Sequence, residues 1–236
     1  MKPWQPILAA LQGEQQKPTI ILLLSAPLLL CWKYFCTPAS FASLLAETGS
    51  AEQAASAGAV GHFASCLILL GVLPALLVKF FVGERLRDYG VGGGFPQRVF
   101  RATLIFGPVF ALAGYLSATD PGLREKFPIN PHAGHSAAVF ALHAATYLAY
   151  YAGWEFYFRG FLLFGLRGSV GDANAVLIQV LASSLLHIGS PPAETFGAIL
   201  GGLLWGMQAL CTRSLIPGLI QHFLLGISLD LALCFP

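Results

Sequence analysis

Long runs of apolar residues recur along the chain, separated by short polar or Gly/Pro-containing connections. A bilayer core needs roughly 20 apolar residues per helix, and these runs lack the alternation of apolar and polar positions that a strand shows. The pattern therefore predicts an all-α, polytopic transmembrane helical bundle with about seven spans. The approximate spans are residues 18–36, 58–82, 99–119, 137–166, 173–188, 195–210 and 215–233. The short fifth and sixth runs favour tilted, broken or partly re-entrant helices.

The composition supports a membrane environment with lipid as a partner. Of 236 residues, 56% are apolar and only 10% are charged, too few charges to cover a soluble globule of this size. We expect a single integral membrane domain over residues 18–236, preceded by an interfacial segment over residues 1–17. A short helix in that segment would present its apolar residues on one side. These residues are Trp4, Ile7, Leu8 and Leu11.

The positions of the basic residues predict how the chain is oriented, because Lys and Arg favour the cytoplasmic side. Those at the predicted inner connections are Lys2, Lys17, Arg85, Arg87, Arg98, Arg101, Arg167 and Arg213. The first connection instead has Glu47 and Glu52 and no basic residue after Lys33. An N-terminus inside and a C-terminus outside satisfy this pattern, with Arg124 and Lys126 as exceptions.

Several other classes of site have no support in the sequence. The five cysteines show no CxxC or zinc-knuckle spacing and are interpreted as packing residues. The glycine-rich stretch at residues 90–96 lacks the strand and spacing of a nucleotide-binding loop. We therefore expect no nucleic-acid partner.

Ionisable residues inside the apolar C-terminal half are the strongest functional signal, because each costs several kcal/mol at the bilayer centre. They are His143, Glu155, Arg159, His187, Glu194, His222 and Asp230. Glu155 and Arg159 are four residues apart and so lie on one helix face. They are either a structural ion pair, or a pair in which Arg159 keeps Glu155 ionised and oriented to polarise a water.

His187 and His222 alone would each be interpreted as structural, but they share the apolar half with Glu155 and Arg159. Counting rises of 1.5 Å per residue from the basic ends places Glu155 and His222 near mid-membrane and His187 further outward. Helix tilt should close that gap. A carboxylate and neutral imidazoles that meet at one water form a general-base site. The same three residues, His187, His222 and Glu155, could instead bind a zinc ion.

The other histidines carry less signal. His143 has no carboxylate at helical spacing, and Tyr147, Tyr150 and Tyr151 offer hydroxyl partners, so we expect a packing or hydrogen-bonding role. The remaining histidines belong to connections or helix ends and give no functional signal: His62, His132 and His135.

Three motifs in the C-terminal half carry a family resemblance. Trp154-Glu-Phe-Tyr-Phe-Arg159 precedes Gly160, Ser183-Ser-Leu-Leu-His187 follows, and the stretch from Thr212 to His222 ends in the third motif. In order and spacing they resemble the CAAX-processing and bacteriocin-processing (abortive-infection) intramembrane proteases. That family shows Glu-Glu-x-x-x-Arg, Phe-x-x-x-His and His-x-x-x-Asn or Asp. The resemblance implies a protease-like core over residues 137–233.

The chain departs from the family pattern at three positions. Trp154 replaces the first glutamate, the residue usually assigned in the family to activate the hydrolytic water. Glu155 aligns with the second, because its separation from Arg159 is four. Gly226 stands where the family has an Asn or Asp that assists at the oxyanion, and Ser183 replaces the Phe.

Two acidic residues are candidates to compensate. Glu194 follows His187 by seven residues, and Asp230 follows His222 by eight. The simpler interpretations are a first-turn or N-cap acid for Glu194 and an interfacial charge for Asp230.

The resemblance and the residues together favour an intramembrane endopeptidase in a bacterial inner (plasma) membrane, acting on a peptide or membrane-protein substrate. His187 and His222 would position the water and stabilise the oxyanion, Glu155 or Glu194 would be the base, and Arg159 would orient the glutamate. This mechanism needs no cofactor, and zinc is the alternative. Small residues would let helices approach closely around the site: Gly197, Ala198, Gly201, Gly202 and Gly206.

Two other functions remain open. A non-proteolytic family member would bind peptides or partner proteins in immunity, regulation or assembly, and Trp154 in the position of the base favours it. A proton-coupled transporter would also bury Glu, Arg and His, although no inverted repeat is visible.

Overall fold

The computed structural model describes residues 3–44 and 49–236, and within these ranges the chain is helical with no strand. Lys2 and Glu47, which entered the charge argument, lie outside the described residues. The first half comprises α1 (Gln5–Ala10), η1 (Gly13–Gln15), α2 (Gln16–Phe35), α3 (Pro38–Ser43), α4 (Ala51–Cys66), η2 (Leu67–Val72), α5 (Leu73–Leu77), η3 (Val78–Val82), η4 (Leu86–Tyr89) and α6 (Pro96–Ser117). The second half comprises α7 (Pro121–Lys126), η5 (Ala133–His135), α8 (Ala137–Glu155), η6 (Phe156–Phe164), α9 (Gly165–Val170), α10 (Asp172–Leu186), α11 (Pro192–Thr212) and α12 (Ile216–Cys234).

The fold confirms the predicted all-α polytopic bundle. In the described part of the chain, five helices are long and apolar enough to cross a membrane: Gly13–Phe35, Ala51–Val82, Pro96–Ser117, Pro192–Thr212 and Ile216–Cys234. The fourth predicted run is one unbroken helix through α8, η6 and α9, and the fifth is the shorter apolar helix α10. The expectation of a broken helix is wrong for the sixth run, because α11 continues without interruption for 21 residues.

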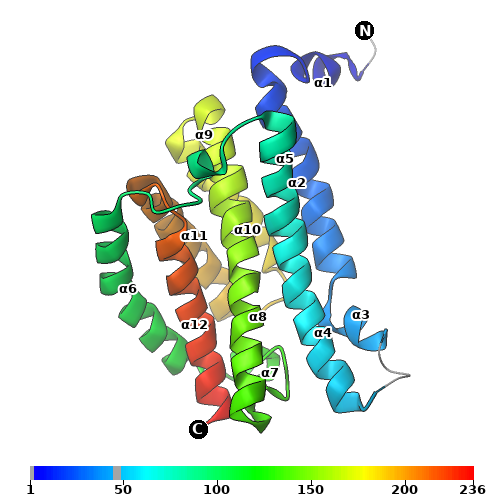
Figure 1. The fold of residues 1–236 in the computed structure, drawn as a ribbon, viewed down its shortest axis with the longest axis vertical. Helices are drawn as coiled ribbons and strands as arrows, with labels where there is room; N and C mark the ends of the chain where they lie inside the picture. The colour runs from blue at the N-terminus through cyan, green and yellow to red at the C-terminus, as the bar shows by residue number, and fades with distance from the viewer. Residues whose placement is uncertain (1–2, 45–48) are drawn as a thin grey trace.

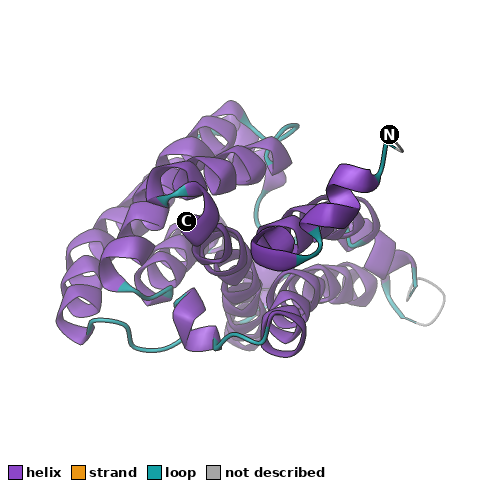
Figure 2. Ribbon diagram, turned by 90° about the horizontal axis from the view of Figure 1, so that it is seen from above, coloured by secondary structure: helices purple, strands orange, loops and turns teal. Residues whose placement is uncertain are grey.

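The long helices stand side by side, with α1 lying across one end of the bundle (Figure 1). Seen from above, they form a bundle of helices joined by short loops (Figure 2). The end that carries α1 also carries α9 and the connection between η3 and α6, whereas α3, α7 and the C-terminus lie at the opposite end (Figure 1). We call these the α1 end and the α7 end.

Basic residues gather at the α1 end, as the predicted orientation requires. Lys17 binds Glu84 at 2.8 Å, and Arg98 donates to the carbonyl of Cys211 at 3.0 Å. Nearby, the amide of Phe95 donates to the carbonyl of Thr212. The N-terminus-inside orientation remains a prediction, and under it the α7 end faces outward.

Large apolar side chains on the outside of the bundle are exposed, as expected for surfaces that face lipid. They include Leu22, Leu30, Ile68, Leu76, Leu104, Leu112, Leu181, Leu185 and Leu200. Trp4, just before α1, and Leu8 on α1 are also exposed, and a one-sided apolar face on this helix stays a prediction. Its position at the membrane interface stays a prediction.

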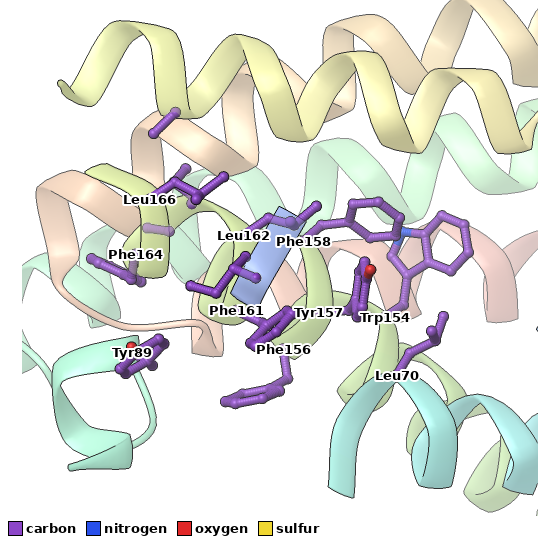
Figure 3. Packing of buried hydrophobic residues seen from close by; sticks show 14 of the residues in the cluster. Leu70, Tyr89, Trp154, Phe156, Tyr157, Phe158, Phe161, Leu162, Phe164 and Leu166 are labelled. Carbon is purple, nitrogen blue, oxygen red and sulfur yellow. The ribbon is translucent and has the colours of Figure 1, made fainter. Parts of the chain in front are cut away.

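The core is built around η6, a π-helical continuation of α8 in which all nine residues are buried. Its sequence is apolar on every side except for Arg159, and a helix that is apolar all round must be surrounded by other elements. Figure 3 shows Phe158, Phe161 and Leu162 packed together in this region, with Trp154 next to Phe158. The site residues on α8 and η6 are therefore held in the most tightly enclosed part of the bundle.

Glycine allows a close helix contact where α8 meets the junction of α4 and η2. A Cβ on Gly153 would lie 2.6 Å from the carbonyl oxygen of Cys66, and one on Gly71 would lie 3.1 Å from the Cα of Gly153. Among the small residues expected to allow close approach, Gly202 and Gly206 face α10, whereas Gly197 faces open space. The contact at Gly153 fixes the position of the next two residues, Trp154 and Glu155.

Candidate functional site

The first polar centre joins α8, η6 and α12. Glu155 ends α8, Arg159 lies one turn later in η6, and His222 projects from α12. Arg159 Nη1 lies 3.2 Å from Glu155 Oε1, which confirms the predicted ion pair. His222 Nδ1 donates to the same oxygen at 2.8 Å. Two side chains, one from η6 and one from α12, thus share the buried carboxylate of Glu155.

Aromatic rings enclose this centre. The His222 ring stacks on Trp205 at a centroid distance of 4.2 Å and lies 4.3 Å from the Tyr151 ring. The Arg159 guanidinium lies 5.3 Å from the Trp205 ring centroid, a cation–π distance. These contacts replace the water that Arg159 and His222 would otherwise bind.

Glu155 is poorly placed to act on a water. Its side chain is 1% exposed, and Oε1 is occupied by Arg159 and His222. A Cβ on Gly218 would lie 2.8 Å from Oε2, so the backbone of α12 closes off that side. The geometry therefore suits Glu155 to orienting His222 rather than to accepting a proton from water.

The second polar centre lies where α10 turns into α11. His187 follows α10, and its Nδ1 donates to the carbonyl of Ser183 at 2.7 Å, an arrangement that leaves Nε2 as the free ring nitrogen. Glu194 lies in the first turn of α11 with Oε1 3.8 Å from His187 Nε2. Lys126 Nζ lies 2.7 and 2.6 Å from the two Glu194 oxygens.

Two lysines from other parts of the chain fix this turn. Lys126 also donates to the hydroxyl of Ser190 at 2.8 Å. Lys33, in the last turn of α2, donates to the carbonyl of Leu186 at 2.7 Å, and a cation is favourable at a helix C-terminus. The side chains of His187 and Glu194 remain 17% and 20% exposed. The carboxylate of the second centre is thus partly exposed, whereas that of Glu155 in the first centre is buried.

The structure therefore divides the five predicted site residues into two groups. Glu155, Arg159 and His222 meet as predicted, but tilt does not bring His187 to them, and His187 pairs with Glu194 instead. Glu194 does begin α11, as the simpler interpretation predicted, but its carboxylate binds Lys126 rather than capping the helix. In the described residues, His187, His222 and Glu155 do not form a group close enough to hold one metal ion.

Trp154 forms part of the wall between the two centres. Its ring is 4% exposed, stacks on Tyr150, and meets the His187 ring edge to face at 5.6 Å. A side chain at position 154 therefore points toward His187, and here that side chain is an indole. Any carboxylate next to His187 must come from another element, and Glu194 provides it.

A third buried pair joins α8 to α12. His143 Nε2 and Asp230 Oδ2 are 2.7 Å apart, and neither side chain is exposed. The hydrogen-bonding role expected for His143 is confirmed, but the expected tyrosine partners are wrong, and so is the interfacial interpretation of Asp230. The next tyrosines along α8 bond to each other, with Tyr151 donating to Tyr147 at 2.8 Å.

Gly226 lies directly against these tyrosines. A Cβ there would meet the hydroxyl of Tyr151 and would lie 3.0 Å from the hydroxyl of Tyr147. The space that an Asn or Asp side chain would need is therefore filled by two phenols.

Sequence reasoning missed Lys126 and Lys33 as parts of the second centre. Lys126 was visible only as an exception to the charge pattern, and Lys33 only as the last basic residue before the first connection. An unexplained cation on the outer side of the membrane was the available signal.

The fold and these centres define an integral membrane protein with a glutamate–arginine–histidine group around a buried carboxylate and a partly exposed histidine–glutamate pair. Residues 136–227 match the family model described as Type II CAAX prenyl endopeptidase Rce1-like. Over these residues the chain is similar to this family of CAAX-processing membrane proteases, as the motifs predicted. No curated protein and no solved structure matches the chain.

Proposed function

We propose that the protein is an intramembrane endopeptidase that hydrolyses a peptide bond with a water held between His187 and Glu194. One observation carries the proposal: the 3.8 Å separation of His187 Nε2 and Glu194 Oε1, with both side chains partly exposed. This separation is too long for a direct hydrogen bond but allows one water to lie about 2.8 Å from each atom. The match of residues 136–227 to the family model supports the reaction class.

The chemistry follows from these two groups. The carboxylate of Glu194 accepts a proton from the water while the water oxygen attacks the peptide carbonyl carbon. The proton then passes to the leaving nitrogen as the C–N bond breaks. His187 Nε2 aligns the water, because its other nitrogen is held by the Ser183 carbonyl. Lys126 holds both oxygens of the carboxylate in place.

In this proposal Glu155 and Arg159 act on His222 rather than on the water. Glu155 accepts the Nδ1 hydrogen of His222 and fixes the orientation of its ring. His222 then presents an unprotonated Nε2, which can accept a hydrogen bond from an N–H of the substrate. The base is thus Glu194, and Glu155 is the residue that orients the second histidine.

A zinc-dependent mechanism at His187, His222 and Glu155 finds no support in the geometry. The carboxylate of Glu155 already binds Arg159 and His222, and His187 contacts Glu194. We therefore derive no step that needs a metal.

The substrate we propose is a membrane-associated peptide or a membrane protein, reached through lipid. With the N-terminus inside, the α7 end and its His187–Glu194 pair face outward. A substrate segment at the outer leaflet of a bacterial inner membrane therefore fits better than a prenylated cytoplasmic tail. Reconstitution with the substrate on one side of the membrane distinguishes the two.

A non-proteolytic binding function is the second candidate, and Trp154 favours it. The indole fills the position from which a first glutamate would act, and the phenols of Tyr147 and Tyr151 occupy the space beside Gly226. Such a protein would keep the peptide-binding fold without cleaving its ligand.

Cleavage assays with purified protein separate these functions. We would incubate the protein in detergent with a panel of transmembrane and prenylated peptides and follow the products by mass spectrometry. The variants are Glu194→Gln, His187→Ala and Glu155→Gln, with Glu125→Gln as an exposed acidic control from the neighbouring helix α7. Melting temperatures show whether each variant is folded.

We expect Glu194→Gln and His187→Ala to lower kcat by about 10²- to 10⁴-fold with little change in melting temperature, and Glu125→Gln to match wild type. Full activity in Glu194→Gln would contradict the assignment of the base. Binding of a peptide by the wild type without cleavage of any member of the panel would instead support the second function.

A further inference from the structure

Three metal-ligating side chains meet at the α7 end, and none of them belongs to either polar centre. Glu52 lies in the first turn of α4, and His132 and His135 lie in the connection that leads to α8. One ligand atom from each lies within 4.8 Å of those from the other two. In the described part of the chain, this is the one such group of histidine, cysteine or acidic residues. We propose that Glu52, His132 and His135 bind one divalent transition-metal ion, with zinc as the best fit.

The separation of the two imidazoles suits a metal ion. His132 Nδ1 and His135 Nε2 are 3.3 Å apart. Two nitrogens bound to one zinc at about 2.0–2.1 Å with tetrahedral angles would be separated by about 3.3–3.4 Å. The ligand atoms therefore already have the spacing that zinc requires.

Glu52 completes the arrangement from the other side of His135. Its carboxylate lies 2.6 Å from His135 Nδ1, and a carboxylate there orients the ring so that Nε2 faces the metal. Because the Glu52 side chain is half exposed, it can also rotate to bind the ion directly. Water fills the remaining positions of this open site.

The backbone that carries the two histidines is held in place by buried contacts. Asn130 is buried, and its side-chain oxygen accepts hydrogen bonds from the amide of His132 and the hydroxyl of Ser56 on α4. Ala133 is fully buried between the histidines. On the other element, Ser50 and Gln53 cap the first turn of α4, which contains Glu52. Little rearrangement is thus needed for binding.

The chemistry of the ligands selects the class of ion. Imidazole nitrogens suit zinc, nickel, copper and similar metals, whereas calcium and magnesium prefer sites made of oxygen. The ion would tie the start of α4 to the start of α8, two helices that pack against each other. The residues of this site differ from those of the proposed peptidase centre. A chelator would therefore remove this ion without acting on the residues that hold the reacting water.

Calorimetric titration of the tag-free protein in detergent with zinc tests the proposal, with calcium and magnesium as negative arms. We expect one zinc per chain, a higher melting temperature with zinc, and no response to calcium or magnesium. His132→Ala and His135→Ala should each weaken binding at least tenfold, and Glu52→Gln by about 10- to 100-fold. Cobalt substituted at the site should give an absorption band that the variants lack.

Two control variants test whether zinc binds at Glu52, His132 and His135 and not elsewhere. Glu125→Gln tests an exposed acid on α7, and His187→Ala tests a histidine of the proposed peptidase centre; both should bind zinc as the wild type does. The metal-free melting temperatures of all variants serve as the folding control. Zinc binding that persists in the His132→Ala/His135→Ala double variant, or that is lost in His187→Ala, would overturn the proposal, as would a wild type that binds no zinc. Loss of peptide cleavage would leave these binding results unchanged, so the two proposals fail independently.

Discussion

Gly153→Ala is the sharpest test of how the helix crossing positions the candidate site. The added methyl group would lie 2.6 Å from the Cys66 carbonyl oxygen and 2.7 Å from the Cα of Leu67. Uncrowded contacts between carbon atoms are about 3.5–4.0 Å, so α8 and η2 must separate by about 1 Å. Both obstacles are backbone atoms of another helix, and no side-chain rotation removes them.

The magnitude is a balance of two effects. Overpacking of this kind costs about 1–3 kcal/mol, and the higher helix propensity of alanine returns up to about 1 kcal/mol. Taking values near the middle of both ranges, we expect a net destabilisation of about 1–2 kcal/mol. For a chain of this length, each kcal/mol lowers the melting temperature by about 2–4 °C. We expect a decrease of about 2–8 °C, with a change in the fluorescence of the adjacent Trp154.

Gly197→Ala is the matched control, because it makes the same substitution in a helix where an added Cβ has no atom within 4 Å. It should leave the melting temperature unchanged or raise it slightly. Thermal unfolding of both variants in one detergent gives the comparison. If Gly153→Ala were as stable as Gly197→Ala, the close contact between α8 and η2 would not exist in the protein.

Two further predictions concern pairs outside the reacting centre. Asp230→Leu leaves His143 buried without its partner and should lower the free energy of unfolding by about 3–5 kcal/mol, whereas adding His143→Leu should recover much of that loss. Equilibrium unfolding in denaturant measures both variants. A double variant less stable than Asp230→Leu would contradict this prediction. Burial raises the pKa of Glu84, but hydrogen bonds from Lys17 and Tyr89 outweigh it and leave the pKa below its usual value. The pair's stabilisation, under about 1 kcal/mol, is thus present above the usual carboxyl pKa and lost as the pH falls through the lowered value. Melting curves between pH 6 and pH 3 should show a smaller decrease in Glu84→Gln than in wild type, and identical decreases would refute the assignment.

Much of the fold could be predicted because each membrane-spanning helix is determined by one continuous stretch of sequence. An apolar run of sufficient length defines a helix without information from elsewhere in the chain. The Glu155–Arg159 pair followed in the same way from helical spacing. His222 was predicted to lie near them from its depth in the membrane, which can be counted along the sequence from the basic end of its helix.

The rest depended on which helices and connections lie beside one another, and periodicity within one helix does not contain that information. Asp230 pairs with a histidine 87 residues earlier, and Lys126 reaches Glu194 across 68 residues. Glu52 and His135 are 83 residues apart. The expectation that helix tilt would bring His187 to Glu155 and His222 also failed, because depth along the membrane does not determine which helix faces meet.

Trp154 was the reason to doubt that the site cuts, and the structure changes what that residue implies. The indole packs edge to face against His187 on one side, so no acid at that position is needed if one approaches from the other. Glu194 does so from the turn between α10 and α11, with Lys126 holding it. The remaining glutamate of the first motif, Glu155, is buried and binds Arg159 and His222. In the proposed mechanism the acid and the histidine that act on water lie together at the α7 end, and the departures from the family motif then describe a displaced base rather than a missing one.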